Sequence, residues 1–96
     1  MIPTFDTTTT FRRCRDARYR NVAGEGLVVR QSVGEVLVLN DVGTRVLDLL
    51  EAGAVVGAVV DALALEYEVD RAVLEQDVTA YLGELLDAGI VERISA

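Results

Sequence analysis

The chain has 96 residues, 51% of them hydrophobic, and carries a formal net charge of −7 at pH 7. This length suffices for one small domain, and the excess of acidic side chains argues against nucleic acid or an anionic membrane surface as partner, because clustered Lys and Arg hold both. With no His and a single Cys, Cys14, the sequence offers no zinc ligand set, no Cys/His catalytic pair and no internal disulfide.

Nothing in the sequence predicts export or insertion into a membrane. The most apolar window, Ala52–Val60, is about half as long as the roughly 20 residues that a membrane-spanning helix needs. Met1–Thr10 has neither the basic start nor the apolar stretch of a signal peptide. We therefore expect a cytoplasmic protein that binds no metal or cofactor.

A flexible N-terminal tail is expected over residues 1–16. Met1–Thr10 is low in complexity because four threonines follow one another from Thr7 to Thr10. The arginines clustered in Phe11–Asp16 are typical of a solvated lead-in. An ordered arm is the alternative for Met1–Thr10.

Three short strands are predicted after the tail. Ala17–Val22 alternates exposed and apolar side chains, and Leu27–Gln31 and Val36–Leu39 are mostly apolar and too short for helices. Ala23–Gly26 and Ser32–Glu35 are typical turn sequences, with glycines that tolerate positive φ. Short turns between successive strands predict an antiparallel meander.

The hydrophobic period then changes to that of a helix. Asn40 or Asp41 can cap a first helix over about Val42–Glu51, and Gly53 is placed to end it. A second helix is expected over Val56–Tyr67, although no good side-chain N-cap precedes it.

The last helix has the strongest amphipathic pattern in the chain. Asp70 is its predicted N-cap, Gly89 its predicted stop, and Ile90–Ile94 a short closing extension. Apolar side chains recur every three or four positions, at Leu74, Val78, Tyr81, Leu82, Leu85 and Leu86.

No catalytic constellation is visible among the acidic residues. Neighbours such as Glu84 and Asp87 are expected on a solvated helix face, since no His or metal cluster accompanies them. Strands followed by helices also outline a winged helix-turn-helix, but the last helix carries several carboxylates against the single Arg71 and would be repelled by DNA. The sequence therefore predicts a binding protein that is not an enzyme.

The Val36–Leu39 strand joins the sheet to the helices. If no further strand pairs with it, one of its edges stays open, and an open edge beside a helix can take up an extended peptide as an added strand.

Several motifs in order resemble the PqqD family. They are Val38-Leu-Asn-Asp-Val-Gly-Thr44, Val46-Leu-Asp-Leu-Leu50 and the ending Leu82-Gly-Glu-Leu-Leu-Asp-Ala-Gly-Ile90, within a similarity over about Ala17–Val91. The family consists of leader-peptide-recognition domains, or RiPP recognition elements, of ribosomally made and modified peptides. The stand-alone leader-binding proteins of lasso-peptide pathways are close relatives.

The resemblance implies an α+β, winged-helix-like domain over residues 17–94, with a three-stranded antiparallel sheet followed by three helices. It also implies a peptide chaperone, in which a leader adds to the third strand in a groove formed with the last helix. Part of the apolar helix residues must nevertheless belong to the core, and Tyr81 suits a half-exposed groove best. The peptide-binding residues implied are Val36, Leu37, Val38, Leu39, Leu74, Asp77, Val78, Tyr81 and Leu85.

The implied partners are a precursor peptide and a maturase. The maturase is a radical enzyme with iron–sulfur clusters, as in PQQ biosynthesis, or a leader peptidase, as in lasso-peptide synthesis; the sequence does not choose between them. Arg18, Arg20 and Arg30 either steer an acidic leader or are solvated surface. A monomer or weak dimer is expected. Two other hypotheses stay open, an acidic winged-helix transcription regulator or protein–protein adaptor, and a scaffold that dimerises through the third-strand edge.

Overall fold

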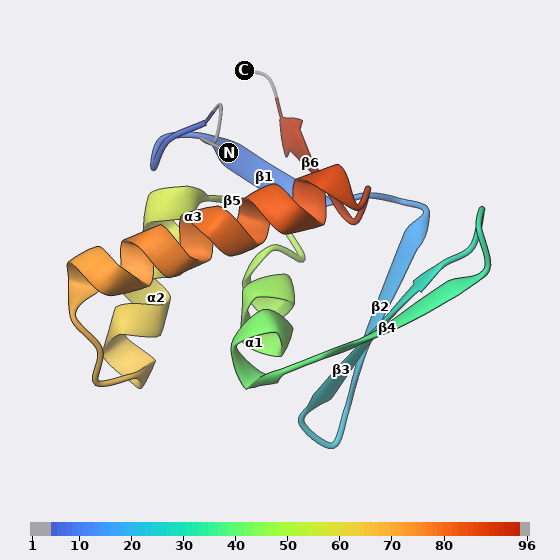
Figure 1. Cartoon of the computed structure of the whole chain (residues 1–96), viewed down its shortest axis with the longest axis horizontal. Coiled ribbons are helices and arrows are strands. Elements are labelled where there is room, and N and C mark those ends of the chain that lie inside the picture. The colour runs from blue at the N-terminus through green and yellow to red at the C-terminus, as the bar shows by residue number, and fades with distance from the viewer. Residues whose placement is uncertain (1–4, 95–96) are drawn as a thin grey trace.

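The computed structural model describes residues 5–94, so the expectation for Met1–Thr4 lies outside it. Two three-stranded antiparallel sheets and three helices make up the fold (Figure 1). The elements are β1 (Thr10–Arg13), β2 (Ala17–Val22), β3 (Glu25–Arg30), β4 (Glu35–Leu39), α1 (Asp41–Leu49), β5 (Ala54–Val55), α2 (Val56–Glu66), α3 (Arg71–Asp87) and β6 (Val91–Ile94). The predicted α+β order, a three-stranded sheet followed by three helices, is confirmed. Within residues 5–94, no helix is both long and apolar enough to cross a membrane.

The β2–β3–β4 sheet is the predicted meander. Its strands pair antiparallel in that order, which leaves β4 at an edge. Ala23 and Gly24 form the two-residue turn between β2 and β3, with φ of 54° and 87°. Positive φ at both positions is the mark of a type I′ turn, whose twist matches that of the flanking strands. The turn is therefore shorter than the predicted Ala23–Gly26.

Gly26 belongs to β3, where it permits a close approach of α1. Its N–H donates to Thr44 Oγ1 over 2.9 Å, and a Cβ at position 26 would lie 2.5 Å from the same oxygen. On the neighbouring strand, the Tyr19 hydroxyl bonds the Thr44 carbonyl at 3.0 Å and Asp48 Oδ1 at 2.6 Å. Burial, followed by this carboxylate, raises the pKa of Tyr19. These contacts fix α1 on the inner face of the sheet.

The second sheet corrects the expected N-terminal tail. β1 lies between β5 and β6, and Phe11 is completely buried, with its ring edge-on to that of Phe5 at a centroid distance of 4.8 Å. The exposed lead-in predicted over Phe11–Asp16 is therefore wrong at β1, because the side chain of Phe11 completes the core. Over its described part, the N-terminal segment is the ordered arm that was the alternative.

The same arm supplies the missing cap of α2. Val55, at the N-cap position, makes no side-chain cap. Instead, the Val56 N–H donates to the Thr9 carbonyl and the Gly57 N–H to the Thr7 carbonyl, each over 2.9 Å. Backbone acceptors from a distant part of the chain thus satisfy amides that a capping side chain usually serves.

The other two helices begin at the side-chain caps predicted for them. Asn40 accepts the Gly43 N–H over 2.8 Å at the start of α1. Asp70 accepts the Ala72 N–H over 2.8 Å at the start of α3.

The end of α3 is a Schellman motif. The Gly89 N–H donates to the Leu86 carbonyl over 3.1 Å and the Ile90 N–H to the Leu85 carbonyl over 2.9 Å, with φ of 75° at Gly89. This confirms Gly89 as the stop, and the closing extension is β6.

One hydrophobic core joins all the layers. In Figure 1, α1 lies between the β2–β3–β4 sheet on one side and α2 on the other, while α3 crosses above both helices. The core takes Phe11 from the second sheet and Val28 from the first. From the helices come Val46, Leu47, Val56, Val59, Val60, Leu63, Leu74, Val78, Leu82 and Leu85.

Candidate peptide-binding site

The open edge of β4 is the candidate site. Among the described strands, β4 pairs with β3 alone. Its side chains alternate: Leu37 and Leu39 are half-buried against the core, whereas Val36 and Val38 are 61% and 65% exposed on the opposite face. The strand thus has an apolar inner side, an apolar outer side and one unpaired edge.

The β2–β3 turn fixes which backbone groups of β3 face which neighbour. Val22 and Glu25 flank a two-residue turn, so their N–H and C=O groups point at each other. In an antiparallel pair this orientation repeats at every second residue, and the bond of 3.2 Å from the Gln31 N–H to the Asp16 carbonyl continues the series. The intervening residue Val28 must therefore direct its N–H and C=O groups toward β4, and so must the carbonyl of Gly26, whose N–H is bonded to Thr44 Oγ1.

The register then assigns the backbone groups of β4. Leu37 and Leu39 lie opposite Val28 and Gly26 and direct their N–H and C=O groups to β3. Val36 and Val38 alternate with them, so their N–H and C=O groups point to the open edge. These two residues carry the free hydrogen-bonding groups of the site.

Tyr81 brings α3 to the end of β4. A Cβ on Gly43 would lie 2.2 Å from the Tyr81 hydroxyl oxygen and 3.2 Å from Asn40 Oδ1. The hydroxyl therefore lies against the first turn of α1, directly after β4. The ring is half-buried and packs on the core, and burial, followed by the charge of Glu84, raises the pKa of its hydroxyl.

Arg30 brings the other end of β4 to the end of α3. Its Nη1 pairs with Glu35 Oε1 at 3.5 Å, and a Cβ on Gly89 would lie 3.1 Å from its Nη2. Positions 81–89 of α3 and its cap, about 12 Å at 1.5 Å per residue, thus match β4, about 13 Å at 3.3 Å per residue. The wall of the site is this last part of α3, which runs antiparallel to the strand.

The structure brings together only some of the predicted site residues. Val36, Leu37, Val38, Leu39 and Tyr81 line β4 or its end. Leu85 lies in the wall segment but is buried.

Leu74, Asp77 and Val78 precede Tyr81, in the part of α3 that packs on α2, and the Arg71 guanidinium pairs with Asp61 of α2 near its start. Leu74 and Val78 are buried and Asp77 is exposed. Their part in binding, like that of Leu85, stays a prediction.

Sequence reasoning considered Arg30 only as a residue that steers an acidic leader or is solvated surface, and did not place it between β4 and the end of α3. Its position two residues after Val28 on β3 was the available signal, since strand alternation puts both side chains on the inner face. Ala88, half-buried at the end of α3, was missed as well.

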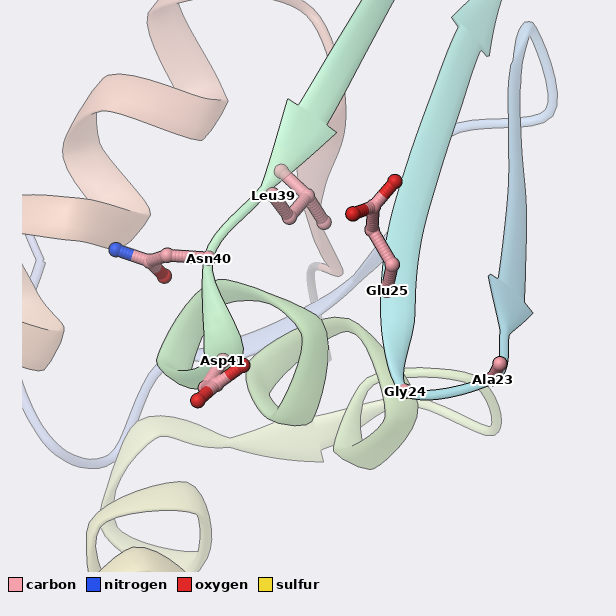
Figure 2. A pocket seen from close by; sticks show the side chains of 6 residues that line it. All are labelled: Ala23, Gly24, Glu25, Leu39, Asn40 and Asp41. Carbon is pink, nitrogen blue, oxygen red and sulfur yellow. The ribbon is translucent and has the colours of Figure 1, made fainter.

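An open hollow of about 470 Å³ lies where β4 ends, between the β2–β3 turn, the start of β3 and the start of α1. Figure 2 shows Glu25 at the start of β3 and Asp41 at the start of α1 among its lining residues, with Leu39 at the end of β4 on the same side as Glu25. Throughout the described chain, no three His, Cys, Asp or Glu side chains gather as they would around a metal ion. What the edge of β4 and the wall beside it offer is backbone hydrogen-bonding groups and apolar surface.

Gly43→Ala tests the packing of Tyr81. Alanine in a helix ordinarily stabilises by about 1 kcal/mol relative to glycine, but here the new methyl group must displace the Tyr81 ring. We expect no gain in the free energy of unfolding and a large NMR shift of the Tyr81 ring protons. Gly83→Ala in α3 is the matched control, because a Cβ there meets open space and should give the full gain. Equal gains in both variants would disprove the contact.

These features define a class: a small α+β domain whose open sheet edge lies beside a helix and can accept an extended peptide. Residues 23–91 match the family model described as Coenzyme PQQ synthesis protein D (PqqD). The chain belongs to the PqqD family, and the resemblance drawn from its motifs is confirmed.

Named relatives agree with this assignment. The chain is 39% identical over 56 residues to a PqqA binding protein of Rhodopseudomonas palustris strain HaA2, a match that covers 58% of this chain and 55% of the relative. The PqqA binding protein of strain TIE-1 is 38% identical over 56 residues, with the same coverage of both chains. The chain thus spans about half the length of the curated relatives it matches.

Solved structures show a similar fold over most of the chain. The structure of TbiB1 in complex with the TbiA(beta) leader peptide matches with a TM-score of 0.81 and 27% identity, covering 88% of this chain and 99% of that one. Lasso peptide synthetase B1 complexed with the leader peptide matches with a TM-score of 0.76 and 26% identity, covering 85% and 96%.

Proposed function

We propose that this protein binds the leader of a ribosomally synthesised precursor peptide as an added strand on β4 and presents it to a modifying enzyme, without catalysing a reaction itself. The open edge at Val36 and Val38, with α3 beside it, is the observation that carries the proposal. The names of similar proteins support it, since the relatives are PqqA binding proteins and the two solved structures with a similar fold are complexes with a leader peptide.

The binding free energy must come from both backbone hydrogen bonds and buried side chains of the leader. Hydrogen bonds to the N–H and C=O groups of Val36 and Val38 contribute a net ~0.5–1.5 kcal/mol each, whereas micromolar affinity needs about 8 kcal/mol. Apolar leader side chains beside Leu37, Leu39 and Tyr81 supply the remainder, at roughly 1.5–3 kcal/mol for each one buried. The edge therefore captures a peptide of any sequence, and the apolar wall selects the leader.

The partners follow from this role. The precursor peptide is one, and a maturase that acts on the rest of the peptide is the other, either a radical enzyme or a leader peptidase. Ribosomal synthesis of the precursor puts the encounter in the cytoplasm. The domain works without a cofactor, as a monomer or weak dimer.

An NMR titration of the ¹⁵N-labelled domain with the leader half of the small peptide encoded nearest to it tests the proposal. We expect saturable shifts at micromolar peptide, concentrated in residues 35–41 and 81–89. A scrambled leader of the same composition is the control and should need far higher concentration. If no candidate leader shifts these residues at near-millimolar concentration, or if the shifts fall on the β1 sheet, the proposal is wrong.

Light scattering of the free domain separates this role from self-association. An added strand from a second copy on β4 would make the mass rise with protein concentration, and leader would then reduce it. A mass that stays that of one chain supports an edge kept for the peptide.

A further inference from the structure

The face of the β2–β3–β4 sheet opposite α1 presents two ordered rows of side chains. In the strand register, Arg18 lies beside Val29 and Val29 beside Val36. Directly opposite residues of an antiparallel sheet point to the same face. In the next row Arg20, Leu27 and Val38 are neighbours in the same way. The face therefore has an apolar stripe over β3 and β4 and a basic border along β2.

This stripe is exposed in the described structure. Val29, Val36 and Val38 are 37%, 61% and 65% exposed, and Figure 1 shows the helices gathered on the opposite side of the sheet. Single exposed apolar residues are ordinary, but adjacent ones rimmed by polar groups mark an interaction site. Arg18 and Arg20 are exposed as well, and neither takes part in an ion pair within residues 5–94.

We propose that this outer face docks the modifying enzyme, through a surface of the enzyme that is apolar at its centre and acidic along one side. The inference rests on the proposed function and adds the surface that the enzyme recognises. The partner is inferred from charge. The chain as a whole has a net charge of −7, so most of its surface repels an acidic partner. The border at Arg18 and Arg20 attracts one, and that contrast fixes where and how the partner binds.

The face also continues onto the bound peptide. A strand added to β4 extends the sheet, so every second leader side chain joins the outer face next to Val36 and Val38. An enzyme docked there touches the domain and its leader at once. It therefore binds the loaded domain more tightly than the empty one.

A second copy of the chain fits this face less well. Glu25 pairs with Val22 at the turn end of the sheet. In a face-to-face pair of chains, the single carboxylate of the partner's Glu25 would have to neutralise both Arg18 and Arg20. An enzyme surface with its own carboxylates meets both arginines.

The test is a double charge reversal, Arg18→Glu with Arg20→Glu. Arg15→Glu with Arg93→Glu is the matched control, because it changes the net charge equally at exposed positions off the face. The probe is the modifying enzyme encoded beside the precursor peptide, and its affinity is measured by biolayer interferometry with and without saturating leader. Leader affinity is measured separately for each variant by fluorescence anisotropy.

We expect the outer-face reversal to weaken enzyme binding to the loaded domain at least about tenfold, since like charges across an interface add repulsion to the lost attraction. The control and the leader affinities should change less than about threefold under the same screening. Val29→Thr tests the apolar stripe with a side chain of similar shape and should weaken enzyme binding without altering leader binding.

The outcomes separate the two claims. If the wild-type domain binds no leader, the proposed function fails and takes this inference with it. Two results would overturn the docking face while the proposed function stands, provided that the leader binds. One is that the outer-face reversal and its control change the affinity for the enzyme equally. The other is that the wild-type domain binds the enzyme equally tightly with and without leader. A wild-type dimer that the outer-face reversal dissociates would also overturn it, because the occupant would then be a second copy.

Discussion

Val38→Pro is expected to abolish peptide binding while the domain stays folded. The Val38 N–H points to the open edge, so proline removes a donor that only an added strand uses, and its ring blocks the approach of that strand. We expect the affinity for leader to fall at least about a hundredfold, or about 3 kcal/mol. The free energy of unfolding should fall little, because proline is tolerated where the N–H of an edge strand faces outward.

Leu37→Pro is the matched control for this result. The Leu37 N–H points to β3, so proline there removes a hydrogen bond of the sheet itself and should destabilise the domain by about 3 kcal/mol or more. Urea denaturation gives the stabilities and isothermal titration calorimetry gives the affinities. A folded Val38→Pro variant with wild-type affinity for the leader would exclude β4 as the site. If Leu37→Pro were the more stable of the two variants, the N–H of Leu37, and not that of Val38, would point to the open edge.

Gly26→Ala is expected to cause the largest loss of stability among the glycine substitutions proposed here. The new Cβ would lie 2.5 Å from Thr44 Oγ1 and 3.2 Å from Leu39 Cδ1, so α1 or β4 must move. Overpacking of this kind costs about 1–3 kcal/mol, and displacement of the hydroxyl also breaks its bond with the Gly26 N–H. The midpoint of urea denaturation should fall accordingly.

A double-mutant cycle identifies the cause. Thr44→Ala alone loses the bond with the buried Gly26 N–H, at about 1–3 kcal/mol, but it also removes the atom with which the new methyl group clashes. The double variant should therefore be more stable than the sum of the two losses predicts. Strict additivity would show that the strain at Gly26 does not come from Thr44.

Local signals were enough to predict the elements around the site. Asn40 or Asp41 was predicted to cap α1, Asp70 to cap α3 and Gly89 to end α3, because each acts on amides or carbonyls a few residues away. The strand at Val36–Leu39 followed from a short apolar run between turn residues. The sequence therefore predicted β4, α1 and α3 and their order, which is most of what positions the peptide site.

Contacts between distant segments were beyond the same reasoning. Thr10 pairs with Val55 and with Ile94, and nothing within a few residues of Thr10 indicates either partner. A run of threonines beside clustered arginines has the composition of a tail, and only the buried side chain of Phe11 distinguishes it. The missing cap of α2 was noticed in the sequence, but its replacement by the Thr7 and Thr9 carbonyls needed the tertiary structure.

The sequence also did not predict that neighbouring residues of β4 have different roles. The sequence predicted Val36–Leu39 as one binding unit, whereas the structure separates the edge backbone of Val36 and Val38 from the inward side chains of Leu37 and Leu39. Which residues of β4 direct their N–H and C=O groups to the open edge depends on the type I′ turn at Ala23 and Gly24. The longer turn predicted from the sequence does not determine this alternation, so an error of two residues in the length of one turn left the hydrogen-bonding pattern of β4 unpredicted.

The position of β1 between β5 and β6 has a consequence for how the molecule is made. The exposed pair of Arg12 and Glu92 joins residues 80 positions apart, and at about 5–20 residues per second a ribosome needs about 4–16 s to cover that distance. The β2–β3–β4 hairpins need only neighbouring residues, and hairpins form within about 1–10 μs. The edge proposed to bind the peptide can thus be built while the chain still emerges, whereas the sheet that holds Phe11 closes last.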